Sequence, residues 1–247
     1  MQTGSTVALP EGPARHIQVL RMQPGQPLRV FDGRGQEWLA RIEEMGRKHV
    51  TVRVCEVMPV DVELPVAVTL AVGMPANDRM DSLIEKATEL GVSVIQPLMC
   101  ERSVLRLDGE RALKKVAHWQ AVAASACEQS GRAVLPQVAP VQSLGTWLRG
   151  SANSEATHAT VGQRAILSTA QGLSLLEWLK GWPVEQAGQA ALRACTFLSG
   201  PEGGFSEAEE QLALQLGWQA VSLGPRILRA DTAPLAAISV IGARFPA

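Results

Sequence analysis

The second part of the chain alternates apolar runs with segments of helical periodicity, the pattern that builds a parallel sheet. The run VAVTLAV (66–72) is continuously apolar, as is typical of a strand buried on both faces. Further apolar runs of strand length follow at 92–98, 165–168, 195–199 and 219–223. Because helical segments separate these runs, the pattern predicts an α/β domain with a mainly parallel sheet over residues 66–247.

Two of the intervening segments are predicted to be helices with defined ends. The first extends from Asp78, a candidate N-cap, to Gly91, a candidate C-terminal stop, and its apolar face carries Met80, Leu83, Ile84 and Ala87. The second extends over 108–130 and ends at Gly131, and its expected inward face carries Leu113, Val116, Trp119 (or Gln120) and Ala123. The stretch 150–160, rich in Ser, Ala, Thr and Asn, is predicted to be a loop.

The first 58 residues have the period-two pattern of β-strands. LRVF (28–31) and QEWLARI (36–42) flank a candidate hairpin turn at 32–35, and HVTVRVCEV (49–57) alternates valines with polar residues. Residues 1–60 are therefore predicted to form a small β-rich domain, either a barrel or a sheet. The segment 58–65 contains two prolines and is a linker or an edge strand.

Composition limits the class of protein. The 247 residues are 46% apolar and 19% charged, as in ordinary soluble globular proteins of one or two domains. The net charge of −1 is weak evidence against a nucleic-acid partner, because phosphate binding usually requires a basic excess. No apolar run is long enough to cross a membrane, and no secretory signal pattern is present, so a cytoplasmic protein without a membrane partner is expected.

The four cysteines are predicted to be reduced thiols. They form no CxxC pair and have no histidine at ligand spacing: Cys55, Cys100, Cys127 and Cys195. This arrangement favours neither a metal site nor a redox site.

The stretch LSGPEGGFSEAEE (198–210) predicts a ligand-binding turn between a strand and a helix. Ser206 and Glu209 have the spacing of a capping box, and the turn before them would lie at the carboxyl edge of the parallel sheet, where α/β proteins bind ligands. Glu202 and Glu207 disfavour a phosphate in this turn, and neither a dinucleotide nor a P-loop motif is present. S-adenosyl-L-methionine, with a neutral adenosine and a cationic sulfonium, fits better.

The next strand is followed by a second turn of this kind. Gly224-Pro225 comes directly after the run 219–223, with Arg226 and Arg229 close behind, and a helix capped by Asp231 or Thr232 then begins. Two such turns on nearby strands indicate a binding site more specifically than either turn alone. The alternative is that both are ordinary connections in which glycine serves only the backbone geometry.

Five ordered blocks of the sequence resemble the RsmE family of small-subunit rRNA methyltransferases, within the SPOUT superfamily. The blocks are HIQVLRMQPGQPLRVFDGRG, DRMDSLIEKATELGVSVIQPLMCERSV, HWQAVAASACEQSGRAVLPQV, LSGPEGGFSEAE and SLGPRILRADTAPLAAI. The resemblance implies a PUA-like RNA-binding domain over 1–60 and a SPOUT methyltransferase domain over 66–247. It also implies a trefoil knot in the second domain, a homodimer, and methylation of uridine N3 in 16S rRNA of the small ribosomal subunit.

The resemblance also implies which residues contact the cofactor. In this numbering they are Leu198, Ser199, Gly200, Glu202, Gly203, Leu223, Gly224, Ile227, Leu228 and Arg229. Two departures from the family pattern are visible. Ala230 and Ala233 stand where the family usually has hydroxyl residues, and the strand with which the family usually begins is missing from the first domain.

Arg229 is the candidate catalytic residue, because a guanidinium could stabilise negative charge on the uracil oxygens when N3 loses its proton. A phosphate contact and an ion pair with Asp231 are the alternatives. Glu202 is either a general base or, more in keeping with its place in the turn, a carboxylate that holds backbone N–H groups. The candidate RNA contacts are Arg15, His16, Arg21, Arg102 and Arg132.

Two other classes of protein remain open at the level of sequence. A non-catalytic RNA-binding module would use the glycine turns as scaffold only, and it would not bind the cofactor. An oxidoreductase of the Rossmann type would bind nicotinamide, but the missing GxGxxG motif counts against it.

Overall fold

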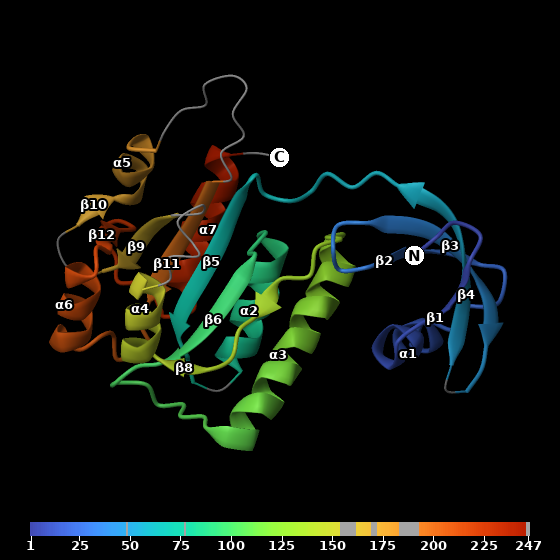
Figure 1. The fold of residues 1–247 in the computed structure, drawn as a ribbon, viewed down its shortest axis with the longest axis horizontal. Coiled ribbons are helices and arrows are strands. Elements are labelled where there is room, and N and C mark those ends of the chain that lie inside the picture. Colours follow the sequence, from blue (N-terminus) through green and yellow to red (C-terminus); the bar gives the residue numbers. More distant parts are fainter. Residues whose placement is uncertain (48, 77, 154–161, 169–171, 183–192, 246–247) are drawn as a thin grey trace. The chain divides into compact units, whose positions relative to one another are not determined.

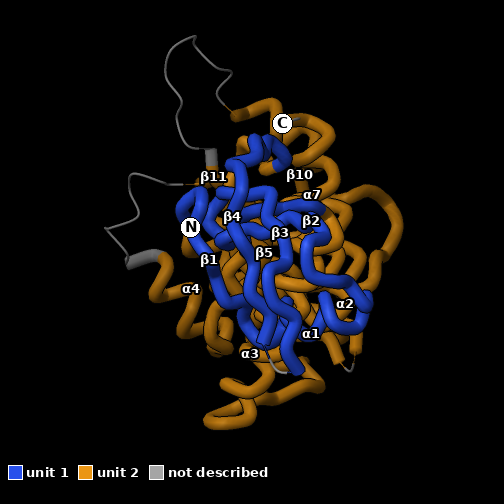
Figure 2. The backbone as a smooth tube through the Cα atoms, turned by 90° about the vertical axis from the view of Figure 1, so that its right-hand side faces the viewer, with its two compact units in different colours: residues 1–62, 131–135 blue, residues 63–130, 136–247 orange. Residues whose placement is uncertain are grey.

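The computed structural model describes residues 1–247 except 48, 77, 154–161, 169–171, 183–192 and 246–247. The chain forms two compact units (Figure 2). Unit 1 contains residues 1–62 and 131–135, and unit 2 contains residues 63–130 and 136–247.

Unit 1 is a four-stranded antiparallel sheet with one helix. The strands are β1 (Thr6–Ala8), β2 (Pro27–Phe31), β3 (Glu37–Met45) and β4 (Val50–Met58), in the order β1-β4-β3-β2. The predicted strands and the turn between β2 and β3 are confirmed, and among the described residues they form an open sheet. Val50, Val52 and Val54 are fully buried, as their alternation predicts.

Helix α1 (Glu11–Val19) was not expected from the sequence. Gly12 and Pro13 in its first turn weaken the helical signal, since both residues have low helix propensity. Ala14 and Ile17 lie one turn apart and are buried in the core of unit 1, beside Trp38 of β3. Tertiary packing of these two side chains therefore compensates for the weak local propensity.

The segment 131–135 belongs to unit 1 although it is distant in sequence. The amide of Gly35 donates to the carbonyl of Ala133 at 3.0 Å, and the amide of Leu135 donates to the carbonyl of Gly33 at 3.0 Å. Val134 forms β-bridges with the same turn. Gly33 and Gly35 have positive φ angles, 73° and 101°, which only glycine adopts readily. The turn of the β2–β3 hairpin thus has a backbone partner from the middle of the chain.

Unit 2 is built on a parallel sheet, as predicted (Figure 1). Among the described residues it has eight strands, with the path β10-β12-β9-β11-β5-β6-β7 and β8 paired to β6. Their bounds are β5 (Val66–Gly73), β6 (Val94–Met99), β7 (Gln137–Val138), β8 (Gln142–Ser143), β9 (Gln163–Leu167), β10 (Leu173–Ser174), β11 (Arg193–Ser199) and β12 (Gln219–Ser222).

Helices cover both faces of this sheet. They are α2 (Arg79–Glu89), α3 (Gly109–Ser130), α4 (Leu144–Asn153), α5 (Leu175–Lys180), α6 (Glu207–Gln215) and α7 (Thr232–Arg244). Leu144 and Leu148 of α4 and Ala213 of α6 pack on one face, against Ala71 of β5 and Leu198 of β11. Helix α7 packs against β5, β11 and α2, and α2 packs against α3. Figure 1 shows α7 on the opposite side of the sheet from α4.

The predicted faces of the two long helices agree with the structure except near the start of α3, where Val116 is half-buried and Leu113 is exposed. All four apolar residues of α2 are buried, and so are Trp119 and Ala123 of α3. Leu113 was predicted to face inward but is 68% exposed, so that prediction is wrong. The buried residues of α3 begin only at Trp119, and helical spacing alone does not show where along the helix burial starts.

Three predicted boundaries can also be compared with the structure. Asp78 occupies the N-cap position of α2, but its side chain makes no capping hydrogen bond. Gly91 has a φ of 94° directly after the helix, as its predicted role requires. Of the loop predicted at 150–160, residues 150–153 belong to α4 and residues 154–160 lie outside the described residues.

Candidate functional site

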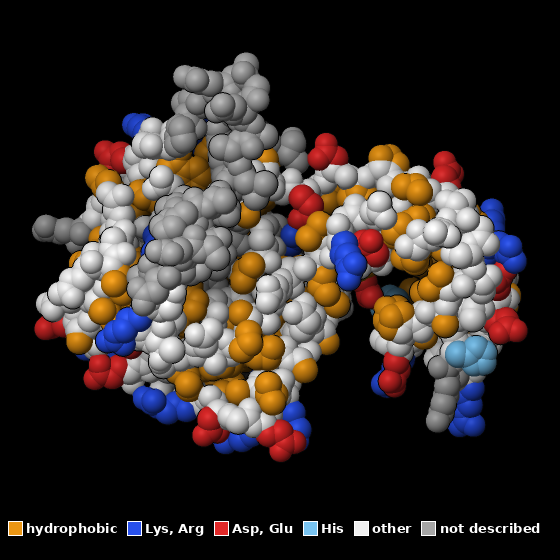
Figure 3. All heavy atoms as spheres, in the orientation of Figure 1, with side chains coloured by type: hydrophobic (Ala, Val, Ile, Leu, Met, Phe, Trp, Pro, Cys, Tyr) orange, Lys and Arg blue, Asp and Glu red, His pale blue; other side chains and the backbone are white. Residues whose placement is uncertain are grey.

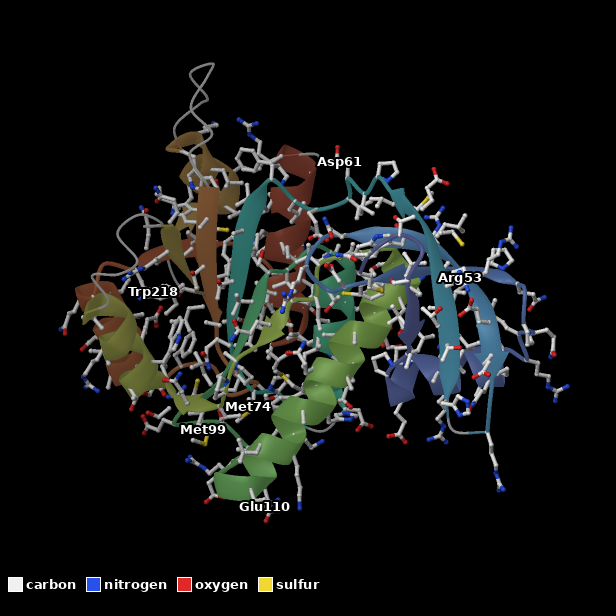
Figure 4. The ribbon with its side chains drawn as sticks, turned by 45° about the vertical axis from the view of Figure 1, so that its right-hand side comes forward. Arg53, Asp61, Met74, Met99, Glu110 and Trp218 are labelled. Carbon is white, nitrogen blue, oxygen red and sulfur yellow. The ribbon has the colours of Figure 1, made fainter. Side chains whose placement is uncertain are left out.

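Strand order brings the two predicted turns to one edge of the unit 2 sheet. The turn after β11 and the turn after β12 are separated by β9 alone, since β9 pairs with both strands in parallel. Met74, which follows β5, and Met99, which ends β6, lie at this same carboxyl edge (Figure 4). The edge is the expected place for a ligand in a parallel α/β sheet.

A pocket of about 440 Å³ lies at this edge. Its volume is within the range of small-molecule sites, about 300–1,000 Å³. Four predicted cofactor contacts line it: Leu223, Gly224, Ile227 and Leu228. Its other lining residues are Leu167, Ser168, Val221, Ser222, Pro225, Arg226 and Ala233.

Leu167 and Ser168 were not predicted as site residues, although the sequence carries a signal for them. These residues end the predicted strand 165–168, and the ends of parallel strands share one edge. What was missing was the strand order, because only the position of β9 between β12 and β11 brings Ser168 to the pocket. Its hydroxyl donates to Glu210 Oε1 of α6 at 2.7 Å, which ties the end of β9 to that helix.

The turn after β12 depends on glycine. Gly224 has a φ of 108°, in the region that side chains with a Cβ rarely adopt. Its amide donates to Ser222 Oγ at 3.2 Å, which closes the turn over the end of the strand. The backbone of this turn and the apolar side chains of Leu223 and Leu228 therefore form one wall of the pocket.

The glycine-rich turn after β11 packs tightly on the end of β5. A Cβ added at Gly73 would lie 2.5 Å from Pro201 Cδ and 2.6 Å from Pro201 N, so no larger residue fits. Leu198 is fully buried and Ser199 is 3% exposed. These two predicted cofactor contacts can therefore offer a ligand their backbone but hardly their side chains.

Glu202 holds this turn against the start of α2. Its Oε1 accepts the backbone N–H of Ala76 at 2.9 Å and the guanidinium of Arg79 at 3.2 Å. The carboxylate thus joins the glycine-rich turn to two residues at the start of α2. These contacts favour the holding role over the general base, in keeping with the preference drawn from the sequence.

Arg102 lies beside the same turn. Its Nη1 donates to the carbonyl of Gly203 at 3.2 Å, and a Cβ at Gly203 would lie 3.0 Å from Arg102 Cβ. The structure thus brings a candidate RNA contact next to a candidate cofactor contact. Ser206 and Glu209 form the predicted capping box of α6, and Glu209 Oε1 also accepts the N–H of Glu101 at 2.7 Å.

Arg229 is exposed, and it is not among the residues that line the pocket. Its carbonyl accepts the amides of Thr232 and Ala233 at 3.0 Å, at the start of α7. The part of the chain that the structure describes shows no ion pair between Arg229 and Asp231, which was one alternative for this arginine. Asp231 Oδ1 is instead buried without a hydrogen-bond partner there.

The remaining RNA candidates lie in unit 1. Arg15 and His16 are exposed on α1, and Arg21 follows that helix with a φ of 55°. Arg132 is only 3% exposed, although a phosphate contact needs an accessible guanidinium. Its burial argues against the predicted RNA contact.

Cys100 and Cys195 are poor candidates for a nucleophile. All four are free thiols. Burial, together with the nearby Glu209 carboxylate, raises the pKa of Cys100 to about 12, and burial raises the pKa of Cys195 to about 12. Both are therefore protonated at neutral pH, and a thiol is a far weaker nucleophile than a thiolate. Within the described residues, no cluster of His, Cys, Asp and Glu could hold a metal ion.

Comparison with known proteins identifies the family. Residues 62–242 match the model of an RNA methyltransferase domain, and residues 9–55 match that of an RNA methyltransferase PUA domain. The chain is 36% identical to ribosomal RNA small subunit methyltransferase E of Synechocystis over 97% of this chain and 73% of that protein. It is 31% identical to the enzyme of the same name from Bacillus subtilis, over 91% of this chain and 84% of that protein. The chain belongs to the ribosomal RNA small subunit methyltransferase E family.

Solved structures of relatives have the same fold. A ribosomal RNA small subunit methyltransferase E from Neisseria gonorrhoeae, bound to S-adenosyl methionine, matches with a TM-score of 0.85 and 37% identity over 99% of this chain and 94% of that chain. A putative methyltransferase from Legionella pneumophila, also in complex with this cofactor, matches with a TM-score of 0.86 and 33% identity over 99% and 94%. The family resemblance of the five sequence blocks is confirmed.

Proposed function

We propose that the protein transfers a methyl group from S-adenosyl-L-methionine to N3 of a uridine in 16S rRNA of the small ribosomal subunit. The observation that carries this proposal is the pocket at the carboxyl edge of the unit 2 sheet. The Gly224 turn forms one wall of this pocket. Two relatives with the same fold have been solved with S-adenosyl methionine bound.

The lining of the pocket fits the cofactor. Leu167, Val221, Leu223 and Leu228 offer apolar surface to a nucleoside, and the Gly224 turn brings backbone groups close to a ligand. Arg226 is the one basic residue among the described residues that line the pocket, and these residues include no P-loop motif, in keeping with a cofactor without phosphates. We assign cofactor contacts to both turns: Leu198, Ser199, Gly200, Glu202, Gly203, Leu223, Gly224, Ile227, Leu228 and Arg229.

The residues of the chain act mainly by positioning. When bound, the cofactor supplies an electrophilic methyl group on a sulfonium, and the attacking N3 must approach it in line. Glu202 holds the glycine-rich turn through Ala76 and Arg79, which fixes the backbone that the cofactor would contact. Arg229 is proposed to stabilise negative charge on the uracil oxygens as N3 loses its proton, which would assist attack most in a site that excludes water.

The remaining features of the proposal follow the family. Unit 1, as a PUA-like domain, would bind RNA through Arg15, His16 and Arg21, and Arg102 would do so in unit 2. The enzyme would act in the cytoplasm as a homodimer, with a trefoil knot in unit 2. Among the described residues, no helix is long and apolar enough to span a membrane. Figure 3 shows basic and acidic side chains interspersed on the visible face. RNA would therefore contact individual basic residues on this face rather than one extended basic surface.

The decisive experiment incubates the protein with labelled S-adenosyl-L-methionine and small subunits that lack the modification. Label in 16S rRNA, mapped to N3 of one uridine, is the expected result. Calorimetry with the cofactor alone is the second measurement, and the absence of both binding and transfer would refute the proposal. Sedimentation in the same buffer reports whether the active species is a dimer.

A further inference from the structure

Two residues of the pocket wall are also open to solvent. Ile227 is 86% exposed, although it is a large apolar side chain, and Arg226 beside it is exposed as well. The guanidinium of Arg226 lies against the Gly224 turn, because a Cβ added at Gly224 would be 3.9 Å from Arg226 Nη2. These side chains form the outer rim of the pocket, the part that an incoming macromolecule meets first.

The rim has an unbalanced positive charge. The ion pairs found among the described residues include neither Arg226 nor Arg229, so no carboxylate lies within 4.0 Å of either guanidinium in that part of the chain. Arg226, which has no acidic partner in that part of the chain and lies next to the exposed aliphatic side chain of Ile227, complements RNA. Phosphate attracts the guanidinium, and a base offers an apolar face to Ile227.

We propose that Arg226 binds a backbone phosphate next to the target nucleotide. This inference rests on the proposed function, since a base that is methylated must reach the pocket and its flanking phosphates must then pass the rim. Arg226 is exposed at the outer edge of the pocket lining, where its guanidinium is open to a phosphate of an RNA strand that enters the pocket. Its role is therefore to bind and orient RNA, separate from the role assigned to Arg229.

The test compares Arg226→Ala, Arg226→Lys and the wild type in binding to a 16S rRNA transcript between 50 and 200 mM salt. Log K falls as log salt rises, and loss of one phosphate contact should make this negative slope shallower by about 0.7–0.9. The affinity advantage of the wild type over Arg226→Ala should therefore shrink by about 2.6–3.5-fold across this range. Arg226→Lys keeps the charge and should keep the slope. Arg111→Ala, which removes an exposed arginine from α3, is the matched control and should behave as the wild type.

Cofactor binding and mass in solution are measured on the same variants. An unchanged slope in Arg226→Ala would overturn the proposal, as would a slope that Arg226→Lys fails to restore. Loss of cofactor affinity in Arg226→Ala would instead assign this side chain to the cofactor, and loss of a dimer would assign the rim to a second copy of the chain. Failure of the wild type to transfer methyl groups would refute the proposed function, while the salt slopes would still decide the role of Arg226.

Discussion

Gly73→Ala tests whether close packing between the end of β5 and the glycine-rich turn shapes the site. The new Cβ would lie 2.5 Å from Pro201 Cδ, 2.6 Å from Pro201 N and 2.9 Å from Cys100 Sγ. Carbon atoms in contact are normally about 3.5–4.0 Å apart, so the ring of Pro201 would have to move by about 1 Å. One of the three clashing atoms belongs to the backbone, so a change of rotamer cannot relieve the overlap.

The expected cost is that of an overpacked core. The free energy of unfolding should fall by about 1–3 kcal/mol. For a chain of this size, the melting temperature should then fall by about 2–12 °C. Because Glu202 ties the turn to Ala76 and Arg79, displacement of Pro201 should also weaken binding of S-adenosyl-L-methionine.

The assay is thermal and urea unfolding followed by circular dichroism, with calorimetry for the cofactor. Gly150→Ala is the control, because a Cβ at this position in α4 meets no atom within 4 Å. It should raise stability by about 0.5–1 kcal/mol, since alanine favours a helix over glycine. A Gly73→Ala protein as stable as the wild type, with unchanged cofactor affinity, would refute this reasoning.

Three further predictions concern other parts of the chain. Asp81→Ala should lower the free energy of unfolding by about 1–3 kcal/mol, because the indole N–H of buried Trp119 donates to Asp81 Oδ1 at 3.0 Å and would lose its partner. Urea unfolding checks this, and the exposed Glu85→Ala on the same helix should change stability by less than about 0.5 kcal/mol. Arg21→Gly should raise stability by about 1 kcal/mol, since arginine there has a φ of 55°. The same variant should bind RNA more weakly if Arg21 contacts phosphate, and a stability gain with undiminished RNA affinity would remove Arg21 from the interface. In native protein at pH 8, a thiol reagent should modify the half-buried Cys55 and spare Cys100, whose pKa is raised to about 12 by burial; rapid labelling of Cys100 would contradict its protonated, inaccessible state.

Five strands of the unit 2 sheet could be predicted because each has enough apolar residues over strand length, most clearly β5, which is largely buried; the two-residue strands β7, β8 and β10 are too short to give such a signal. The turn at Gly224 and the capping box of Ser206 were also visible, since each depends on residue types with narrow backbone preferences. Helix α1 was not visible, because packing of Ala14 and Ile17 rather than local propensity holds it together. The exposure of Leu113 could not be predicted either, because it depends on how much of α3 is covered by other parts of the protein.

Only part of the site could be predicted from the sequence, because the order of the strands in the sheet decides which turns and strand ends meet. Residues on one turn can be found from that turn, and Leu223, Gly224, Ile227 and Leu228 were found in this way. Ser168 comes from a strand whose place in the sheet no local pattern encodes. The burial of Arg132 was not predicted either, because a lone arginine in a sequence block carries no sign of how much of its side chain the folded protein covers.

The backbone hydrogen bonds between the β2–β3 turn and residues 133–135 affect any attempt to divide the protein. A fragment that stops near residue 62 would lack one of its own structural pieces, and the complementary fragment would carry that piece with nothing to pair with. Cutting the linker would therefore yield two imperfect products instead of two intact modules. Insertions or deletions around residues 131–135 should disturb the N-terminal unit more than their position in the sequence suggests.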